Sequence, residues 1–158
     1  MGISTFLLFK RGESIAANDL LSNIKNLCIR ENLFFDTDEE KFNIGGVLKY
    51  SRVYISDIPF EEDYSRQLCF SLYDEPYDYQ TVSFKWDDIH SEYFKALVSD
   101  DFCDNEDLLF RFVYSVLNIY PSAKIWIEDD WFYTLEDLEK IKRKPYDNNW
   151  CYKHPKSS

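Results

Sequence analysis

The chain has few side-chain groupings that could carry out a reaction, and each lacks a necessary part. Two carboxylate pairs, at residues 100–101 and 129–130, offer the oxygen ligands that Mg²⁺ prefers, but acidic loops supply such pairs by chance. Cys151 and His154 have the spacing of half a zinc site, and the sequence holds no second half. His90 lies beside Ser91 on a predicted helix, where adjacent side chains point in different directions. These patterns predict a protein that is not an enzyme and binds no metal.

Phosphate and cofactor chemistry is also poorly supported. The four glycines lie at positions 2, 12, 45 and 46, so no glycine-rich phosphate loop can be built. The net charge of −11 over 158 residues argues against nucleic acid or an anionic membrane as the direct partner, since both require a basic surface. We expect no cofactor.

The acidic charge is concentrated in the middle of the chain. Residues 1–55 are neutral overall, residues 56–137 carry a net charge of −15, and residues 138–158 carry +4. The acids cluster at predicted connections, where binding residues are common. Helix capping or solubilising charge explains some of them, such as Asp87, Asp104 and Asp107, but explains the total less well.

Aromatic residues stand beside these acids, as is typical where a steered encounter ends in a desolvated anchor. Tyr77, Trp126 and Trp131 are the best anchor candidates, whereas Trp86 shares a strand face with apolar residues and is predicted to be core. The predicted partner-binding residues are Asp74, Glu75, Tyr77, Asp78, Trp126, Glu128, Asp129, Asp130 and Trp131.

The elements that would position these residues form a single α+β domain over residues 1–158, with a polar tail from about residue 145. Periodicity predicts strands at 3–9, 47–56, 67–73, 79–86 and 123–128, with 131–133 pairing back. The runs from 47 to 86 read as an antiparallel meander, with residues 74–78 as a hairpin turn. Helices are predicted at 19–31, capped by Asn18, at about 88–98, from Asp104 to 120, and at 135–142, capped by Thr134. We therefore expect a mostly antiparallel sheet of five to six strands, with about four helices on one face. Residues 36–46, which end in Gly45 and Gly46, read as a loop or as a bulge before a strand.

Targeting signals are missing from the sequence. The apolar run at residues 3–9 is short and precedes Lys10 and Arg11, which is the wrong order for a secretory signal. Cys28 and Cys69 fall on apolar patterns and read as buried thiols. We expect a cytoplasmic protein.

With these features the chain resembles the bacterial immunity proteins of contact-dependent growth inhibition and other polymorphic toxin systems. The acidic-aromatic stretches DEPYDY (residues 74–79) and IWIEDDWFYTLEDLEKI (residues 125–141) carry the resemblance. It implies a complex with a basic cognate toxin domain, often a nuclease, whose active site is blocked. Independently, a nuclease must present Lys and Arg to bind phosphates, so the acidic segment would be drawn to it.

Three other functions remain open from the sequence. A phage-type DNA mimic would use its acids as a phosphate track and would bind several unrelated proteins. A metal-dependent hydrolase would use Asp129 and Asp130, and would show saturable Mg²⁺ or Mn²⁺ binding with turnover. An adaptor subunit would have no inhibitory role.

Overall fold

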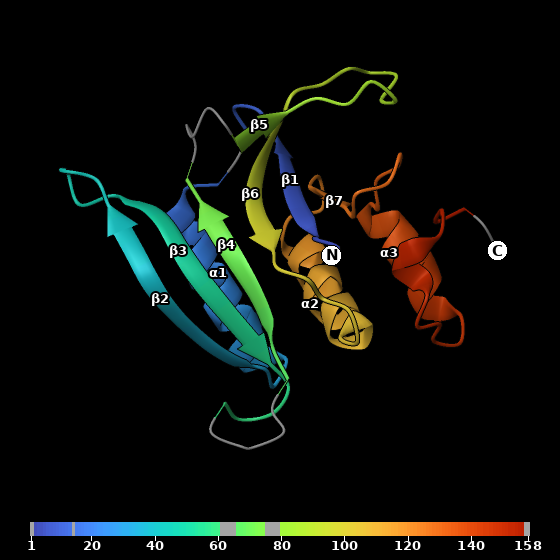
Figure 1. Ribbon diagram of the computed structural model, residues 1–158, viewed down its shortest axis with the longest axis horizontal. Helices are drawn as coiled ribbons and strands as arrows, with labels where there is room; N and C mark the ends of the chain where they lie inside the picture. The colour runs from blue at the N-terminus through green and yellow to red at the C-terminus, as the bar shows by residue number, and fades with distance from the viewer. Residues whose placement is uncertain (1, 14, 61–65, 75–79, 157–158) are drawn as a thin grey trace.

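The computed structural model is one antiparallel sheet with helices packed on it (Figure 1), and it describes residues 2–13, 15–60, 66–74 and 80–156. Within these residues the sheet has seven strands, and the order β2-β3-β4-β6-β1-β7 runs across it, with β5 paired to β6. The strands are β1 (Phe6–Lys10), β2 (Phe34–Phe42), β3 (Leu48–Ser56), β4 (Leu68–Tyr73), β5 (Thr81–Val82), β6 (Tyr93–Ser99) and β7 (Lys124–Trp126). The α-helices are α1 (Ala17–Arg30), α2 (Glu106–Ile119) and α3 (Leu135–Arg143), and Trp150–Tyr152 form the short 3₁₀ helix η2. The α+β class is thus confirmed, with fewer α-helices than predicted.

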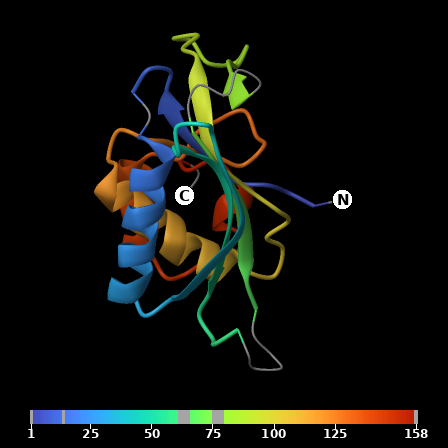
Figure 2. The same ribbon diagram turned by 90° about the vertical axis from the view of Figure 1, so that its left-hand side faces the viewer.

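Helices α1 and α2 cover one face of the sheet (Figure 2), and their apolar stripes form the main core with it. Helix α1 buries Leu20, Ile24, Leu27 and Cys28, the face that its periodicity predicts. Helix α3 packs against α2. Its N-terminus has the predicted Thr134 cap as a full capping box, in which Thr134 and Asp137 each bond the other's backbone amide.

A second, aromatic core lies on the opposite face of the sheet, over β1, β6 and β7. Leu8, Phe84 and Tyr93 are buried there, and five partly buried side chains pack around them: Phe6, Val82, Trp86, Trp126 and Phe132. Phe84 contacts Trp86, Trp126 and Phe132 with ring centroids 4.6–5.4 Å apart. The sheet is therefore covered on both faces near these strands.

The helix predicted at residues 88–98 is wrong, because this segment contains the central strand β6. β6 pairs with β4 on one side and with β1 on the other. Five of its seven residues are buried, since both faces of the sheet are covered here. A strand buried on both faces has no alternating pattern, and its run of apolar residues matched helical spacing by coincidence.

Two further predictions need correction. Residues 36–46 were expected as a loop or as a bulge before a strand, but β2 occupies most of the segment as an edge strand. Most of its side chains are exposed, so no apolar periodicity marks it. The strand predicted at 79–86 shortens to β5, which pairs with β6 rather than with β4, so the third strand of the predicted meander is missing.

The C-terminal segment is docked on the body through η2, as the aromatic residues at 150–152 indicate. Trp150 and Cys151 are buried, and the Trp150 indole N–H donates to the Glu106 carbonyl at 3.0 Å. In the described part of the chain, no helix combines the length and apolar character needed to cross a membrane.

Candidate functional site

The strand order brings two acidic segments to one end of the sheet. Because β1 is antiparallel to both neighbours, Phe6 at its start pairs with Val98 near the end of β6 and with Trp126 at the end of β7. The residues that follow β6 and β7 therefore flank the chain leading into β1. We call this surface the acidic end and define it by Asp100, Asp101, Glu128, Asp129 and Asp130.

The acidic end holds the first residues of the chain by their amides. The Ile3 N–H donates to Asp101 Oδ1 at 3.2 Å, and the Ser4 N–H donates to Glu128 Oε2 at 2.8 Å. Gly2 lies so close that a Cβ there would come within 2.2 Å of the Asp101 Cβ. Asp101 Oδ1 also accepts from the Cys103 N–H at 3.1 Å, and the hydrogen bonds from Cys103 and Ile3 lower the pKa of Asp101 below its usual value.

Little positive charge compensates these acids. Asp100 pairs with Arg52 at 2.7 Å, but none of Asp101, Glu128, Asp129 and Asp130 has an ion pair within the residues that the structure describes. Partial burial, together with the negative charges of Asp130 and Glu128, raises the pKa of Asp129 above its usual value. The turn after β7 therefore concentrates negative potential.

Trp126 and Trp131 lie on either side of this acidic turn, residues 128–130, along the chain. The Trp126 indole N–H donates to the Asp129 carbonyl at 2.7 Å, and its ring packs on Phe6 at 4.7 Å. Trp131 lies against His154, with ring centroids 5.3 Å apart. Both tryptophans are half-buried, so each presents part of its ring to solvent and part to the core.

Asp74, also predicted to contact a partner, lies at the other end of the sheet and is 6% exposed. Its carboxylate accepts a 2.8 Å bond from the Ala17 N–H and forms a 2.8 Å ion pair with Lys49. It therefore satisfies the first turn of α1, the role that the sequence assigned to Asn18, whose side chain forms no cap. Glu75, Tyr77 and Asp78 lie outside the described residues.

The two acidic stretches that suggested one surface are consequently separated. Asp74 follows β4, and the turn after β7 lies three strands away across the sheet, about 14 Å at the usual strand spacing, and at the opposite end. The sequence missed the real neighbour of Glu128–Asp130, which is Asp101. Asp101 can be recognised as this neighbour only from the strand order β6-β1-β7. That order could not be inferred from the sequence, because residues 88–98 were predicted to be a helix.

Metal binding and thiol chemistry can be examined in the described residues. Within the described residues no group of three His, Cys, Asp or Glu side chains could hold a metal ion. Burial raises the pKa of Cys28 and of Cys151 to about 12, so both are protonated, unreactive thiols at neutral pH. What the acidic end can do is attract and contact a cationic surface.

No family model, curated protein or solved structure matches this chain. The function is therefore argued from the acidic end itself.

Proposed function

We propose that this protein is an immunity-type inhibitor that binds a basic toxin domain, of the nuclease class, and blocks its active site. The observation that carries the proposal is the group of carboxylates after β7, which lack a cationic partner among the described residues and stand between two half-buried tryptophans.

The electrostatics of the acidic end favour a cationic partner. Partial burial raises the pKa of Asp129, and repulsion from Asp130 and Glu128 raises it further. Lys or Arg side chains of a partner would offset this repulsion, so the electrostatic free energy of the acidic end would be lower in the complex than in the free protein. Complementary charge also accelerates association, to about 10⁸–10⁹ M⁻¹s⁻¹ at low salt.

The aromatic side chains favour a long-lived complex. Trp126 and Trp131 are held by packing and, for Trp126, by the bond to the Asp129 carbonyl, so little side-chain entropy is lost on binding. Rigid aromatic residues of this kind are common hot spots, and they act mainly by slowing dissociation.

Co-expression with the toxin tests the proposal. The gene directly upstream, where the cognate toxin is expected, is expressed with wild type, with Asp129→Lys/Asp130→Lys, or with a control that reverses two exposed acids elsewhere, Glu13→Lys/Asp88→Lys. We expect wild type and control to protect the cell and the acidic-end variant to fail. Equal protection by both variants would refute the site, and no protection by wild type would refute the function. Binding of several unrelated DNA-binding proteins would instead favour a DNA mimic.

A further inference from the structure

Apolar side chains are exposed at the tip of the hairpin that joins β2 and β3. Phe42, Ile44 and Val47 are 56%, 108% and 46% exposed, although they lie within six residues of one another. We call residues 42–47 the finger. Figure 1 shows it projecting beyond the body of the sheet, at the far side from α3. Exposed apolar groups concentrated in this way are typical of interaction sites.

The finger has a defined conformation. The Asn43 N–H donates to the Val47 carbonyl at 2.9 Å, and the Asn43 side chain accepts from the Val47 N–H at 3.0 Å. Gly46 closes the turn with a φ of +78°, which favours glycine. The apolar side chains are therefore presented from a fixed turn rather than from a loose loop.

Residues 36–41 of β2, which lead into the finger and which we call its stem, are mostly acidic. The outer edge of the same strand is poorly suited to pairing with a further strand. Asp36, Asp38, Glu39 and Glu40 outnumber Lys41 there, and all are exposed. Asp36 accepts the Thr37 N–H at 2.8 Å, and the pairing with β3 shifts register beyond Asp38. Both features discourage a further strand on this edge, so the tip is the part suited to contact.

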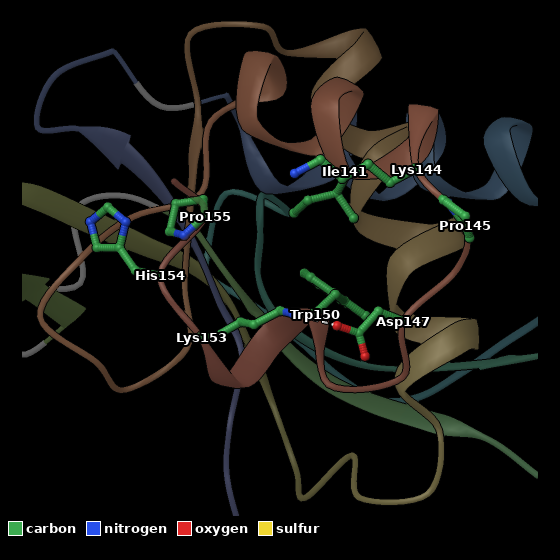
Figure 3. Close-up of a pocket in the computed structure, with 8 residues that line it drawn as sticks. All are labelled: Ile141, Lys144, Pro145, Asp147, Trp150, Lys153, His154 and Pro155. Atoms are coloured by element: carbon green, nitrogen blue, oxygen red, sulfur yellow. Dashed lines mark ion pairs between the residues drawn. The ribbon is translucent and has the colours of Figure 1, made fainter. Parts of the chain in front are cut away.

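A pocket at the other end of the molecule has complementary chemistry. Between the end of α3 and η2, Figure 3 shows a hollow with apolar walls from Ile141, Pro145, Trp150 and Pro155. Lys144 and Lys153 lie at its rim, and the pocket acid Asp147 is already paired with Lys153 at 2.5 Å. A neighbouring hollow adds Arg143 and Lys156, and also Lys140, which is paired with Glu136 at 3.1 Å.

We propose that the finger of one copy docks into this pocket of a second copy, with its apolar tip against the apolar walls and its acidic stem beside the basic rim. Finger and pocket lie at opposite ends of the long axis (Figure 1), so a copy cannot fill its own pocket. The contact is head-to-tail, and each added copy leaves one free finger and one free pocket. A single hairpin tip buries less surface than a standard interface, so the association is weak and concentration-dependent. The proposal is independent of the toxin partner.

Sedimentation of the 158-residue protein over a range of concentrations tests this docking. We expect the mass of the wild type to rise above the 19.0 kDa monomer, and Ile44→Asp and Lys144→Glu each to remain monomeric. Ile29→Asp, which changes a 67% exposed isoleucine in α1, is the control and is expected to assemble like wild type. Unchanged unfolding midpoints would show that the variants fold.

Mixing the two variants that do not assemble on their own is the decisive step. The Ile44→Asp copy keeps an intact pocket, and the Lys144→Glu copy keeps an intact finger, so together they are expected to form a pair of twice the monomer mass and nothing larger. A wild type that stays monomeric at its highest soluble concentration would overturn the proposal. So would a mixture that stays monomeric while the wild type assembles, and so would a Lys144→Glu variant that assembles like wild type, which would indicate finger-to-finger contact. If the wild type stays monomeric but Ile44→Asp weakens toxin binding, the finger serves that partner instead.

Discussion

Replacing Asp74 separates a structural role from a role in partner binding. In Asp74→Ala, the buried Ala17 amide loses its acceptor, and a buried donor left unsatisfied at the start of a helix costs about 1.5–2 kcal/mol. The Lys49 side chain is 29% exposed, so its ammonium regains water, and losing the ion pair costs about a further 0.5–1 kcal/mol. We expect a loss of about 2–3 kcal/mol in the free energy of unfolding.

Asp74→Asn is the matched variant, because the amide oxygen still accepts the Ala17 N–H while the charge facing Lys49 is gone. Its expected cost is therefore only the ion-pair part, about 0.5–1 kcal/mol. Urea unfolding followed by tryptophan fluorescence measures both, and with a slope of about 2 kcal/mol/M the Asp74→Ala midpoint falls by about 1 M.

Two results would refute this reasoning. Equal destabilisation by the two variants would show that the hydrogen bond accepted from the Ala17 N–H does not contribute to stability. An Asp74→Ala protein with wild-type stability and weakened toxin binding would show that Asp74 serves the partner, as the sequence alone indicated.

Three further predictions concern charge and capping. Because the pKa of Asp129 is raised in the folded protein, its ionised carboxylate lowers the free energy of unfolding as the pH rises above about 4. Asp129→Asn is therefore expected to stabilise the protein by about 0.5 kcal/mol at pH 7 and to make no difference at pH 3, as measured by urea unfolding. Hydrogen bonds from Arg66 lower the pKa of Asp57 and of Asp107, so the stability that this cluster adds is lost as the pH falls below about 4. Arg66→Gln is expected to cost about 1 kcal/mol at pH 7 and to flatten the acid limb of the stability curve. Thr134→Ala is expected to cost about 1 kcal/mol through the lost cap of α3, whereas Thr134→Ser retains most of it; thermal unfolding distinguishes the two.

The sequence predicted those elements whose burial follows a simple period. Helix α1 shows one apolar face, and β4 alternates strictly between buried and half-buried residues, so each appeared within a few residues of its predicted position. Thr134 marked the start of α3 because a capping residue acts locally. In these cases local chemistry and tertiary environment agree.

The failures arise where the environment overrides local pattern. β6 is buried on both faces and β2 on neither, so neither strand shows the alternation of a half-buried strand. Asp104 was expected to cap α2, but the structure places it at a positive φ of 71° and Asn105 precedes the helix. The candidate site suffered from the same limit, since proximity of Asp101 to Glu128 depends on strand order, which sequence periodicity does not contain.

The most direct test of the acidic end is the dissociation constant between the purified protein and the catalytically inactive domain encoded directly upstream. Reversing Asp129 and Asp130 removes two favourable charge contacts and adds two repulsive ones, so we expect Asp129→Lys/Asp130→Lys to weaken binding by about 100-fold, equivalent to about 2.8 kcal/mol. The control Glu13→Lys/Asp88→Lys makes the same change in net charge and is expected to stay within about threefold of wild type, a shift of about 0.6 kcal/mol. Equal weakening by both variants would show that only net charge matters, and would contradict a specific docking role for the acidic end.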